Sequence, residues 1–212
     1  VIEEQANRLR QIQHAQQSIL VHPENLPEAN FGIVYQPIQE AGGDFYDVFK
    51  LNDHVFGYFV ADISAHDLGA SYATSALKAL IRQNSSLLYT PDETIRIVNS
   101  ILLSIFSDGQ HLTGVCLCLD KKKALLHIVN AAHLPVLFLE ANGKYRWLEA
   151  DGDVLGVFDT AHFACQSINI SSGDRFFVYS DGLLESFGPD PRNREQGKNQ
   201  LVEFALKNRN LE

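Results

Sequence analysis

Apolar runs of strand length follow one another closely along this chain, and their succession limits the possible folds more than any other feature. The runs predict strands at 31–38, 44–51, 54–63, 112–120, 124–131, 135–140, 162–170 and 174–180. Polar residues at 52–53 and 121–123 separate neighbouring runs and are typical of hairpin turns. Strands joined by such short turns pair antiparallel, so we expect antiparallel sheets.

Two helices are expected to interrupt the strands, and a third follows them. The first is expected over 68–83, where apolar residues recur at helical spacing. The second has a clear start, because Thr90 can cap it, Pro91 suits the first helical position and Glu93 completes a capping box. A last helix is expected over 197–207. This order of elements indicates an α+β protein in which helices cover antiparallel sheets.

Residues 1–22 differ from the rest of the chain because they hold neither glycine nor proline. Apolar residues and glutamines share the heptad positions of a weak coiled-coil seam. This helical segment could pack on its own domain, pair with a second copy as a homodimer, or connect to an upstream domain. Residues 23–212 are expected to form the main domain. The start at Val1 and the absence of methionine predict a piece of a longer protein.

The composition excludes several classes of protein. A net charge of −9 argues against a surface for nucleic acid or for an anionic membrane. No stretch approaches the ~20 apolar residues of a membrane span. Cys116, Cys118 and Cys165 lack the spacing of a zinc site, so we expect reduced thiols in a cytoplasmic protein.

Asp44, Asp62 and Asp181 each stand where an apolar, strand-like run meets a turn. A carboxylate at a buried strand end is costly unless something compensates its charge. Small residues or glycine adjoin all three, which suggests a cation held between strand ends. Hard divalent ions such as Mg²⁺ and Mn²⁺ take oxygen ligands from carboxylates, carbonyls and water. These residues therefore predict a metal-dependent hydrolase.

Simpler interpretations of these residues stay open at this point. Asp44 could be an exposed residue at an ordinary strand entry, and Asp62 could lie in a turn before a helix that one of its neighbours caps. His66 lies four residues after Asp62 and could donate a proton to a leaving oxygen. His133, at a strand-to-turn junction, is a second candidate for such a role.

Four segments of the chain occur in an order that is specific to one family. They are Gly42-Gly43-Asp44-Phe45-Tyr46-Asp47, Ala61-Asp62-Ile63-Ser64-Ala65-His66-Asp67, Asn130-Ala131-Ala132-His133-Leu134-Pro135 and the run from Gly173 through Ser180-Asp181-Gly182 to Glu185. Together they resemble the bacterial branch of the metal-dependent PPM (PP2C-type) protein phosphatases, the branch of SpoIIE and RsbU. The resemblance covers about residues 24–206. It implies a two-sheet antiparallel β-sandwich flanked by helices, with an N-terminal helical extension.

The resemblance also implies a site and a reaction. Two Mn²⁺ or Mg²⁺ ions would lie at one end of the sandwich, with Asp62 bridging them. The main-chain carbonyl of Ile63 would add a ligand, and Asp44 and Asp181 would complete the inner set. A metal-bound water would attack the phosphorus of a phosphoserine or phosphothreonine, because the family uses no protein nucleophile. The implied substrate is a small regulatory phosphoprotein of a sigma-factor pathway, such as an anti-anti-sigma factor, and the implied upstream domain is a receiver or a sensor.

The chain departs from the family's pattern in three places. Ala65-His66-Asp67 stands where Gly-His-Gly is usual, and Ala132 stands where glycine is usual. The family's final Asp-Asp segment has no counterpart in this sequence, so one ion is expected to bind more weakly. These departures favour an alternative, in which the chain is a degenerate binding module. It would then be the output domain of an RssB-like response regulator and would bind a sigma factor or an anti-anti-sigma factor.

Overall fold

The computed structural model describes residues 11, 14–36, 43–64, 68–106, 109–185 and 191–210. The strands are β1 (Asp44–Lys50), β2 (Val55–Ile63), β3 (Leu112–Asp120), β4 (Leu125–Ala131), β5 (Val136–Leu139), β6 (Tyr145–Leu148), β7 (Cys165–Asn169) and β8 (Arg175–Phe177). The helices are α2 (Leu68–Asn84), α3 (Pro91–Ile105), α4 (Gly182–Glu185) and α5 (Pro191–Lys207), and the short 3₁₀ turns η1 (Pro23–Asn25) and η2 (Pro27–Ala29) precede β1.

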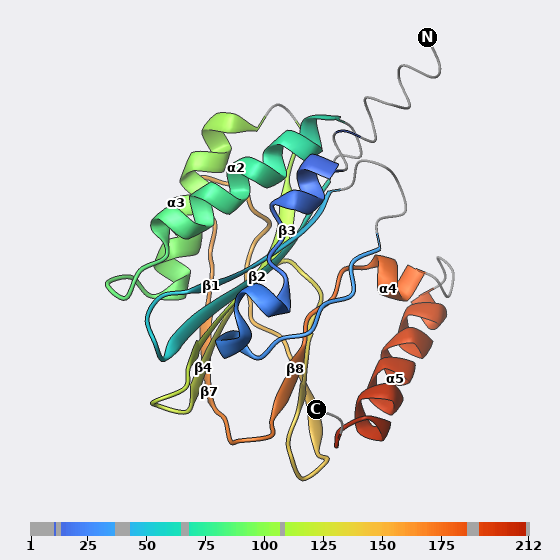
Figure 1. Ribbon diagram of the computed structural model, residues 1–212. Coiled ribbons are helices and arrows are strands. Elements are labelled where there is room, and N and C mark those ends of the chain that lie inside the picture. The colour runs from blue at the N-terminus through green and yellow to red at the C-terminus, as the bar shows by residue number, and fades with distance from the viewer. Residues whose placement is uncertain are drawn as a thin grey trace.

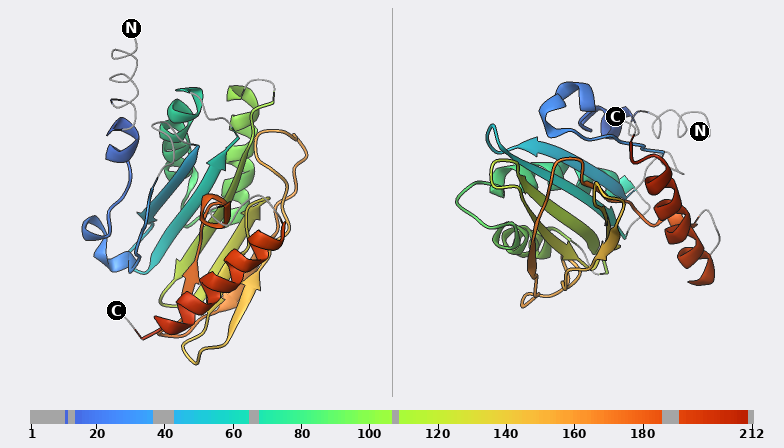
Figure 2. Two further views of the ribbon diagram at one scale, coloured as in Figure 1. Left: turned by 90° about the vertical axis from the view of Figure 1, so that its right-hand side faces the viewer. Right: turned by 90° about the horizontal axis from the view of Figure 1, so that it is seen from below.

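The strands form two sheets that pack face to face, as Figure 1 shows. The larger sheet has the order β1-β2-β3-β4-β7, and the smaller has the order β6-β5-β8. Every ladder between these strands is antiparallel. Helices α2 and α3 cover the outer face of the larger sheet, and α5 lies against the smaller sheet (Figure 1, Figure 2). The prediction of an α+β, two-sheet antiparallel sandwich flanked by helices is confirmed.

Apolar clusters hold these elements together, and three of them join the helices and the two sheets. The outer layer lies between the larger sheet and helices α2 and α3, and it includes Phe59 and Val98. The central layer lies between the two sheets and includes Leu117 and Phe138. A smaller cluster, which includes Val202, joins α5 to the smaller sheet. Because side chains alternate between the two faces of a strand, every second side chain along a strand of the larger sheet points toward the smaller sheet.

An ion pair between a half-exposed arginine and a buried carboxylate joins α2 to β1. Asp47 has an exposed fraction of 0%. Arg82 donates hydrogen bonds to both of its carboxylate oxygens, over 2.6 and 2.8 Å. Lys78 Nζ lies 3.7 Å from the Oδ1 atom of Asp47. Burial lowers the pKa of Lys78 despite the nearby carboxylate, whereas the hydrogen bond to Asp47 raises the pKa of Arg82. The pair therefore holds α2 on the strand that begins at Asp44.

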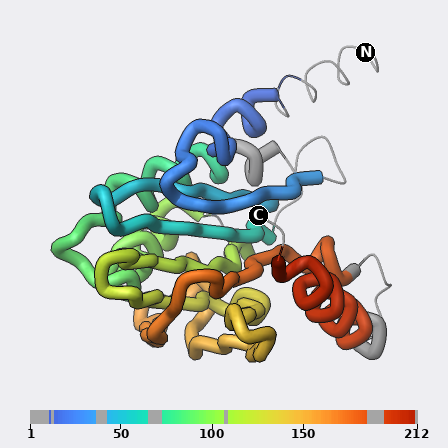
Figure 3. The backbone as a smooth tube through the Cα atoms, turned by 60° about the horizontal axis from the view of Figure 1, so that its bottom comes forward, coloured from blue at the N-terminus to red at the C-terminus, as the bar shows by residue number. Residues whose placement is uncertain are grey.

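The expected strand at 31–38 is wrong for residues 31–36, which form no strand, and residues 37–38 lie outside the described part of the chain. Instead of a backbone ladder, the Tyr35 hydroxyl of this segment donates to the main-chain carbonyl of Asp44 over 3.3 Å, and two other tyrosine hydroxyls hold the chain that precedes the segment. Tyr46 donates to the carbonyl of Val21 over 3.0 Å, and Tyr58 donates to the carbonyl of Ala29 over 2.5 Å. Figure 3 shows the segment alongside β1, the edge strand of the larger sheet.

Three other elements differ from expectation for physical reasons. β8 ends at Phe177 because residues 178–180 leave the ladder and turn toward the larger sheet. β6 was not expected, since it is only four residues long and includes Arg146. Helix α5 begins at Pro191, earlier than the expected 197, because its first residues are too polar to show an apolar period. The start of α3 is as expected, and the backbone N–H of Thr90 donates to the Glu93 carboxylate over 2.7 Å.

The described end of the N-terminal segment packs on its own domain. Residues 14–18 are helical, and the Gln16 amide donates to the Thr74 hydroxyl over 3.5 Å. The carbonyl of Ile19 accepts a hydrogen bond from Lys78, and Ile19 and Leu20 pack against the outer apolar layer. The expected coiled-coil seam falls largely on residues 1–10 and 12–13, which are outside the described residues. Within the described residues, no helix has both the length and the apolar character that a membrane crossing requires.

Candidate metal centre

Asp44 and Asp62 lie directly opposite each other in the larger sheet. Asp44 opens β1, Asp62 is the next-to-last residue of β2, and the antiparallel register makes them partners. Both are half-buried, and Asp62 shares its face with Tyr58 and Val60, which pack against the central apolar layer. Partners of this kind have Cβ atoms about 4.5–5.5 Å apart. The hairpin therefore brings two of the predicted carboxylates together at one end of the sandwich.

Ile63 can offer only its main-chain carbonyl, because its side chain is buried in the outer apolar layer. Gly43 lies against that carbonyl, and its own carbonyl accepts a hydrogen bond from the N–H of Ile63 over 3.2 Å. A Cβ atom on Gly43 would lie 2.2 Å from the oxygen of Ile63 and 3.1 Å from Oδ1 of Asp62. Only glycine therefore lets the chain before Asp44 approach these two oxygens so closely.

The replacement Gly43→Ala should damage the site more than the fold. The added methyl group must push apart the backbone at Ile63 and the strand entry at Asp44. Since misplacing reacting groups by about 1 Å can cost about 100-fold in rate, we expect a loss of metal-dependent turnover of about that size. The matched control is Gly32→Ala, because nothing lies within 4 Å of a Cβ at Gly32. Equal turnover in the two variants would contradict the close approach.

Asp181 arrives from the smaller sheet. It follows the end of β8, and its neighbour Ser180 donates a hydrogen bond to Oδ2 of Asp44 over 2.9 Å. The stretch of chain that carries Asp181 thus lies against the Asp44–Asp62 pair. In the part of the chain that the structure describes, no three carboxylate, imidazole or thiol side chains are grouped closely enough to hold a metal ion. The assignment of Asp181 as a ligand stays a prediction.

His133 joins the two sheets beside these carboxylates. Its Nδ1 atom lies 2.9 Å from the hydroxyl oxygen of Thr113, the partner of Asp62 in the β2–β3 register. Its Nε2 atom lies 3.1 Å from the carbonyl oxygen of Tyr179. A carbonyl oxygen only accepts, so Nε2 carries the proton and Nδ1 accepts from the Thr113 hydroxyl. Both ring nitrogens of this neutral imidazole are occupied by protein partners.

The pKa of His133 agrees with a structural role for the ring. Burial lowers this pKa, and the hydrogen bond to Tyr179 and the charge of Asp181 oppose the shift only in part. The imidazole is therefore neutral near pH 7 and is not set up to donate a proton to a leaving group. His66, the other histidine considered from the sequence, lies outside the described residues, and its role stays a prediction.

Sequence reasoning missed three hydroxyl groups near the carboxylates. Besides Ser180 and Thr113, Tyr35 donates to the main-chain carbonyl of Asp44 over 3.3 Å. Burial, and then the charge of Asp44, raise the pKa of Tyr35, so its hydroxyl stays protonated. One signal was present for Thr113, which is a polar residue at an inward position of an otherwise apolar strand. The sequence held no comparable signal for Tyr35.

Ala132 adopts the left-handed conformation that favours glycine, with φ of 54°. This is the position at which the family pattern usually has glycine. The left-handed conformation costs a residue other than glycine about 1–2 kcal/mol. Glycine offsets part of this gain because it has more conformational entropy in the unfolded chain, so we expect Ala132→Gly to stabilise the fold by about 0.5–1 kcal/mol. Chemical denaturation measures the change. Ala141→Gly is the control, because Ala141 lacks a positive φ, and the opposite sign is expected there.

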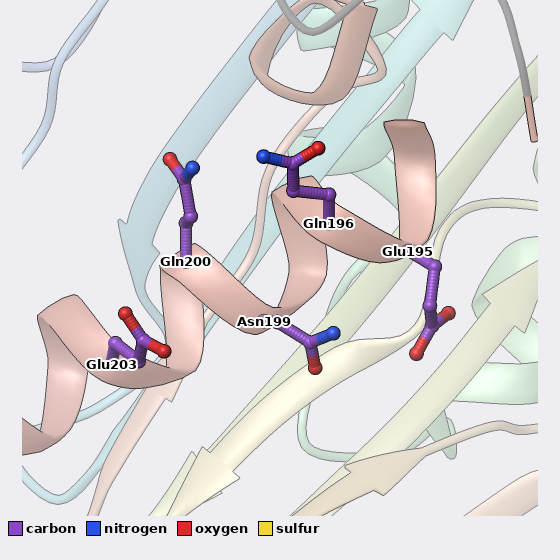
Figure 4. A pocket seen from close by; sticks show the side chains of 5 residues that line it. All are labelled: Glu195, Gln196, Asn199, Gln200 and Glu203. Atoms are coloured by element: carbon purple, nitrogen blue, oxygen red, sulfur yellow. The ribbon is translucent and has the colours of Figure 1, made fainter. Parts of the chain in front are cut away.

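A polar hollow on α5 lies apart from these residues. Its lining residues are Glu195, Gln196, Asn199, Gln200 and Glu203, which Figure 4 shows along that one helix. Glu195 and Glu203 are two turns apart, a rise of about 12 Å along the axis, so they cannot share one cation. The hollow therefore offers no second metal site.

The oxygen donors beside Asp44 suit a hard divalent cation. Two carboxylates and a main-chain carbonyl are the kind of ligands that Mg²⁺ and Mn²⁺ prefer. The absence of a side chain at Gly43 lets the backbone before Asp44 lie against these oxygens. The donor set thus fits the metal that the sequence predicts.

Comparisons with known proteins agree with this geometry. The family model described as stage II sporulation protein E (SpoIIE) matches residues 52–212. The phosphoserine phosphatase RsbP of Bacillus subtilis is 23% identical over 174 residues, which is 80% of this chain and 43% of RsbP. The chain thus spans less than half the length of that relative.

Solved structures share the fold. The RsbU and RsbW domains of Rv1364c from Mycobacterium tuberculosis match with a TM-score of 0.72 and 24% identity, over 84% of this chain and 49% of that one. The SiaA-PP2C domain of Pseudomonas aeruginosa matches with a TM-score of 0.75 and 17% identity, over 95% of this chain and 91% of that one. Because the family model matches most of this chain, the chain belongs to the SpoIIE family of PPM-type (PP2C-type) phosphatase domains.

Proposed function

We propose that this chain is a phosphatase domain that uses Mn²⁺ or Mg²⁺ to remove phosphate from phosphoserine or phosphothreonine on a small regulatory protein. The observation that carries the proposal is the cross-strand pair Asp44–Asp62, against which Ser180 holds the segment with Asp181. Like charges directly opposite each other destabilise an antiparallel pair. A divalent cation between them removes that cost, so the pair makes physical sense as a metal site.

In this proposal Asp62 would hold both ions, and Asp44, Asp181 and the main-chain carbonyl of Ile63 would supply further ligands. The bound ions would supply a nucleophile from water and would stabilise charge on the phosphoryl oxygens. The protein's part is to hold its carboxylates at fixed positions on rigid strand ends, which keeps the phosphoryl group and the ions aligned. His66 would donate a proton to the leaving oxygen.

The relatives support this assignment. RsbP is described as a phosphoserine phosphatase, and the related RsbX was solved in complex with magnesium. For the whole protein we propose a cytoplasmic signalling role in a sigma-factor pathway. An upstream receiver or sensor domain would act through residues 1–22, as a linker or as a homodimer contact.

Metal-dependent hydrolysis tests the proposal. The purified chain is assayed on p-nitrophenyl phosphate and on phosphoserine-containing casein, with Mn²⁺, with Mg²⁺ and after chelation. We expect turnover with either ion, loss on chelation and recovery when metal is restored. If a chain with an intact circular dichroism spectrum turns over neither substrate at millimolar Mn²⁺, the proposal is wrong.

A second candidate is a binding module without turnover. It is favoured because the described residues group fewer than three metal-binding side chains, and because Asp67 adds a negative charge where the family pattern has glycine. This module would bind a sigma factor or an anti-anti-sigma factor. Binding of a purified anti-anti-sigma factor that survives Asp62→Ala, together with absent hydrolysis, would support it. Binding that requires Mn²⁺ would count against it.

A further inference from the structure

The candidate ligands come from two different sheets, which poses a problem of alignment. Asp44 and Asp62 are fixed to each other by the β1–β2 ladder. Asp181 follows β8, which belongs to the smaller sheet and pairs only with β5 among the described strands. Apolar packing between sheets is not directional, so it cannot by itself set the spacing between carboxylates. Directional bonds between the sheets are needed at this end.

Two hydrogen-bonded links provide that direction. The first is the bond from the Ser180 hydroxyl to Oδ2 of Asp44, over 2.9 Å. The second runs from the Thr113 hydroxyl through the His133 ring to the carbonyl of Tyr179, over 2.9 and 3.1 Å. Both links end on consecutive residues, 179 and 180, immediately before Asp181.

We infer that Ser180 and His133 are positioning residues that set the distance between the Asp44–Asp62 pair and Asp181, and that they thereby determine the affinity for Mn²⁺. The inference rests on the metal site of the proposed function and adds the residues that align it. Neither residue needs to touch the metal.

The chemistry of each group suits this task. An ionised carboxylate has about four lone-pair sites, so Asp44 can accept the Ser180 hydroxyl and still bind a cation. The His133 ring is neutral and bonded at both nitrogens, so it is fixed in one tautomer and one orientation. Its partner Thr113 lies directly opposite Asp62 in the β2–β3 ladder. The His133 ring therefore fixes the position of Tyr179 relative to Asp62.

Removing one hydroxyl group tests the first link. Outer partners of metal ligands change metal affinity about 10–100-fold when they are lost, so Ser180→Ala should weaken Mn²⁺ binding by that factor in calorimetry. Ser180→Thr keeps the hydroxyl and should restore affinity to within about threefold of the wild type. A role confined to stability would lower the melting temperature of the metal-free protein and leave the affinity unchanged.

The second link is tested at Thr113, because replacing the buried His133 could prevent folding. Thr113→Val keeps the shape and removes the donor to Nδ1, so we expect a loss of Mn²⁺ affinity, which Thr113→Ser should recover. The matched control is Ser167→Ala, which removes a hydroxyl 2.7 Å from Nδ1 of His127 in the same sheet. That contact, between β4 and β7, does not involve the metal end, and its loss should leave the affinity unchanged.

The outcomes separate this inference from the proposed function. If the wild-type chain does not bind Mn²⁺, the metal site itself is wrong. If the wild type binds Mn²⁺ while Ser180→Ala and Thr113→Val bind it equally well, the site stands and the positioning role is refuted. Weakened binding in both variants, with recovery in Ser180→Thr and Thr113→Ser, establishes the role.

Discussion

Replacing Asp62 by Asn should abolish metal-dependent hydrolysis and, at the same time, stabilise the metal-free protein. Asn has the size of Asp but lacks the charge that would bridge the ions. A loss of about 4 kcal/mol of charge stabilisation in the transition state corresponds to about a 1,000-fold fall in turnover. Without metal, Asp44 faces a like charge across the ladder, so neutralising Asp62 should add about 0.5 kcal/mol of stability.

The two opposite signs make this prediction specific. Calorimetry with Mn²⁺ and hydrolysis of p-nitrophenyl phosphate measure the loss, and urea denaturation of the chelated protein measures the gain. Asp53→Asn is the matched control, because Asp53 lies at the other end of the same hairpin and its side chain is 83% exposed. That variant should keep its turnover. A destabilised metal-free Asp62→Asn protein would show that Asp62 has a structural role instead.

The second large effect concerns the ion pair between Arg82 of α2 and the buried carboxylate of Asp47 in β1. Among the described residues, Arg82→Ala leaves the fully buried carboxylate of Asp47 with the more distant Lys78 as its one cationic partner, 3.7 Å away. Removing one member of a buried pair costs about 3–5 kcal/mol, and this case lies at the lower end, about 3 kcal/mol, because Lys78 remains and the Arg82 side chain is 42% exposed. For a chain of this length each 1 kcal/mol lowers the melting temperature by about 2–4 °C, so a fall of about 6–12 °C is expected.

Two further variants identify the cause of that loss. Lys50→Ala removes an exposed ion pair with Asp53 and should leave the melting temperature nearly unchanged. The double variant Asp47→Leu with Arg82→Met removes both charges and should be much more stable than Arg82→Ala alone. If the double variant is as unstable as Arg82→Ala, lost packing rather than the stranded carboxylate is responsible. Each folded variant should bind Mn²⁺ as the wild type does, since Asp47 faces α2 and not the gap between the sheets.

Much of the larger sheet could be predicted because its signals are local. The apolar run at 54–63 and the turn at Asn52-Asp53 predict a hairpin, and a turn at that point puts residue 44 opposite residue 62. The pairing of two of the candidate ligands was thus implicit in the chain. The start of α3 could be predicted for the same reason, because the two residues of its capping box, Thr90 and Glu93, are only three positions apart.

The links that join the sheets could not be predicted because they have no local signal. The Ser180–Asp44 bond spans 136 residues, and the His133–Tyr179 bond spans 46 residues. Each depends on how two sheets are placed, and apolar alternation says only which side chains face inward. The strand expected at 31–38 failed for a related reason. An apolar run cannot show that a tyrosine side chain, rather than a backbone ladder, will bond the segment to the neighbouring strand.

A metal site with ligands from both sheets, as proposed here, would have a kinetic consequence. β1 and β2 can pair early, because a hairpin closes a short loop, whereas Asp181 can join them only after the smaller sheet has docked. A cation that needs all three carboxylates would bind the finished fold and not the transition state that precedes docking. Manganese should therefore slow unfolding and leave the refolding rate nearly unchanged. The metal would then stabilise the folded protein kinetically without taking part in its assembly.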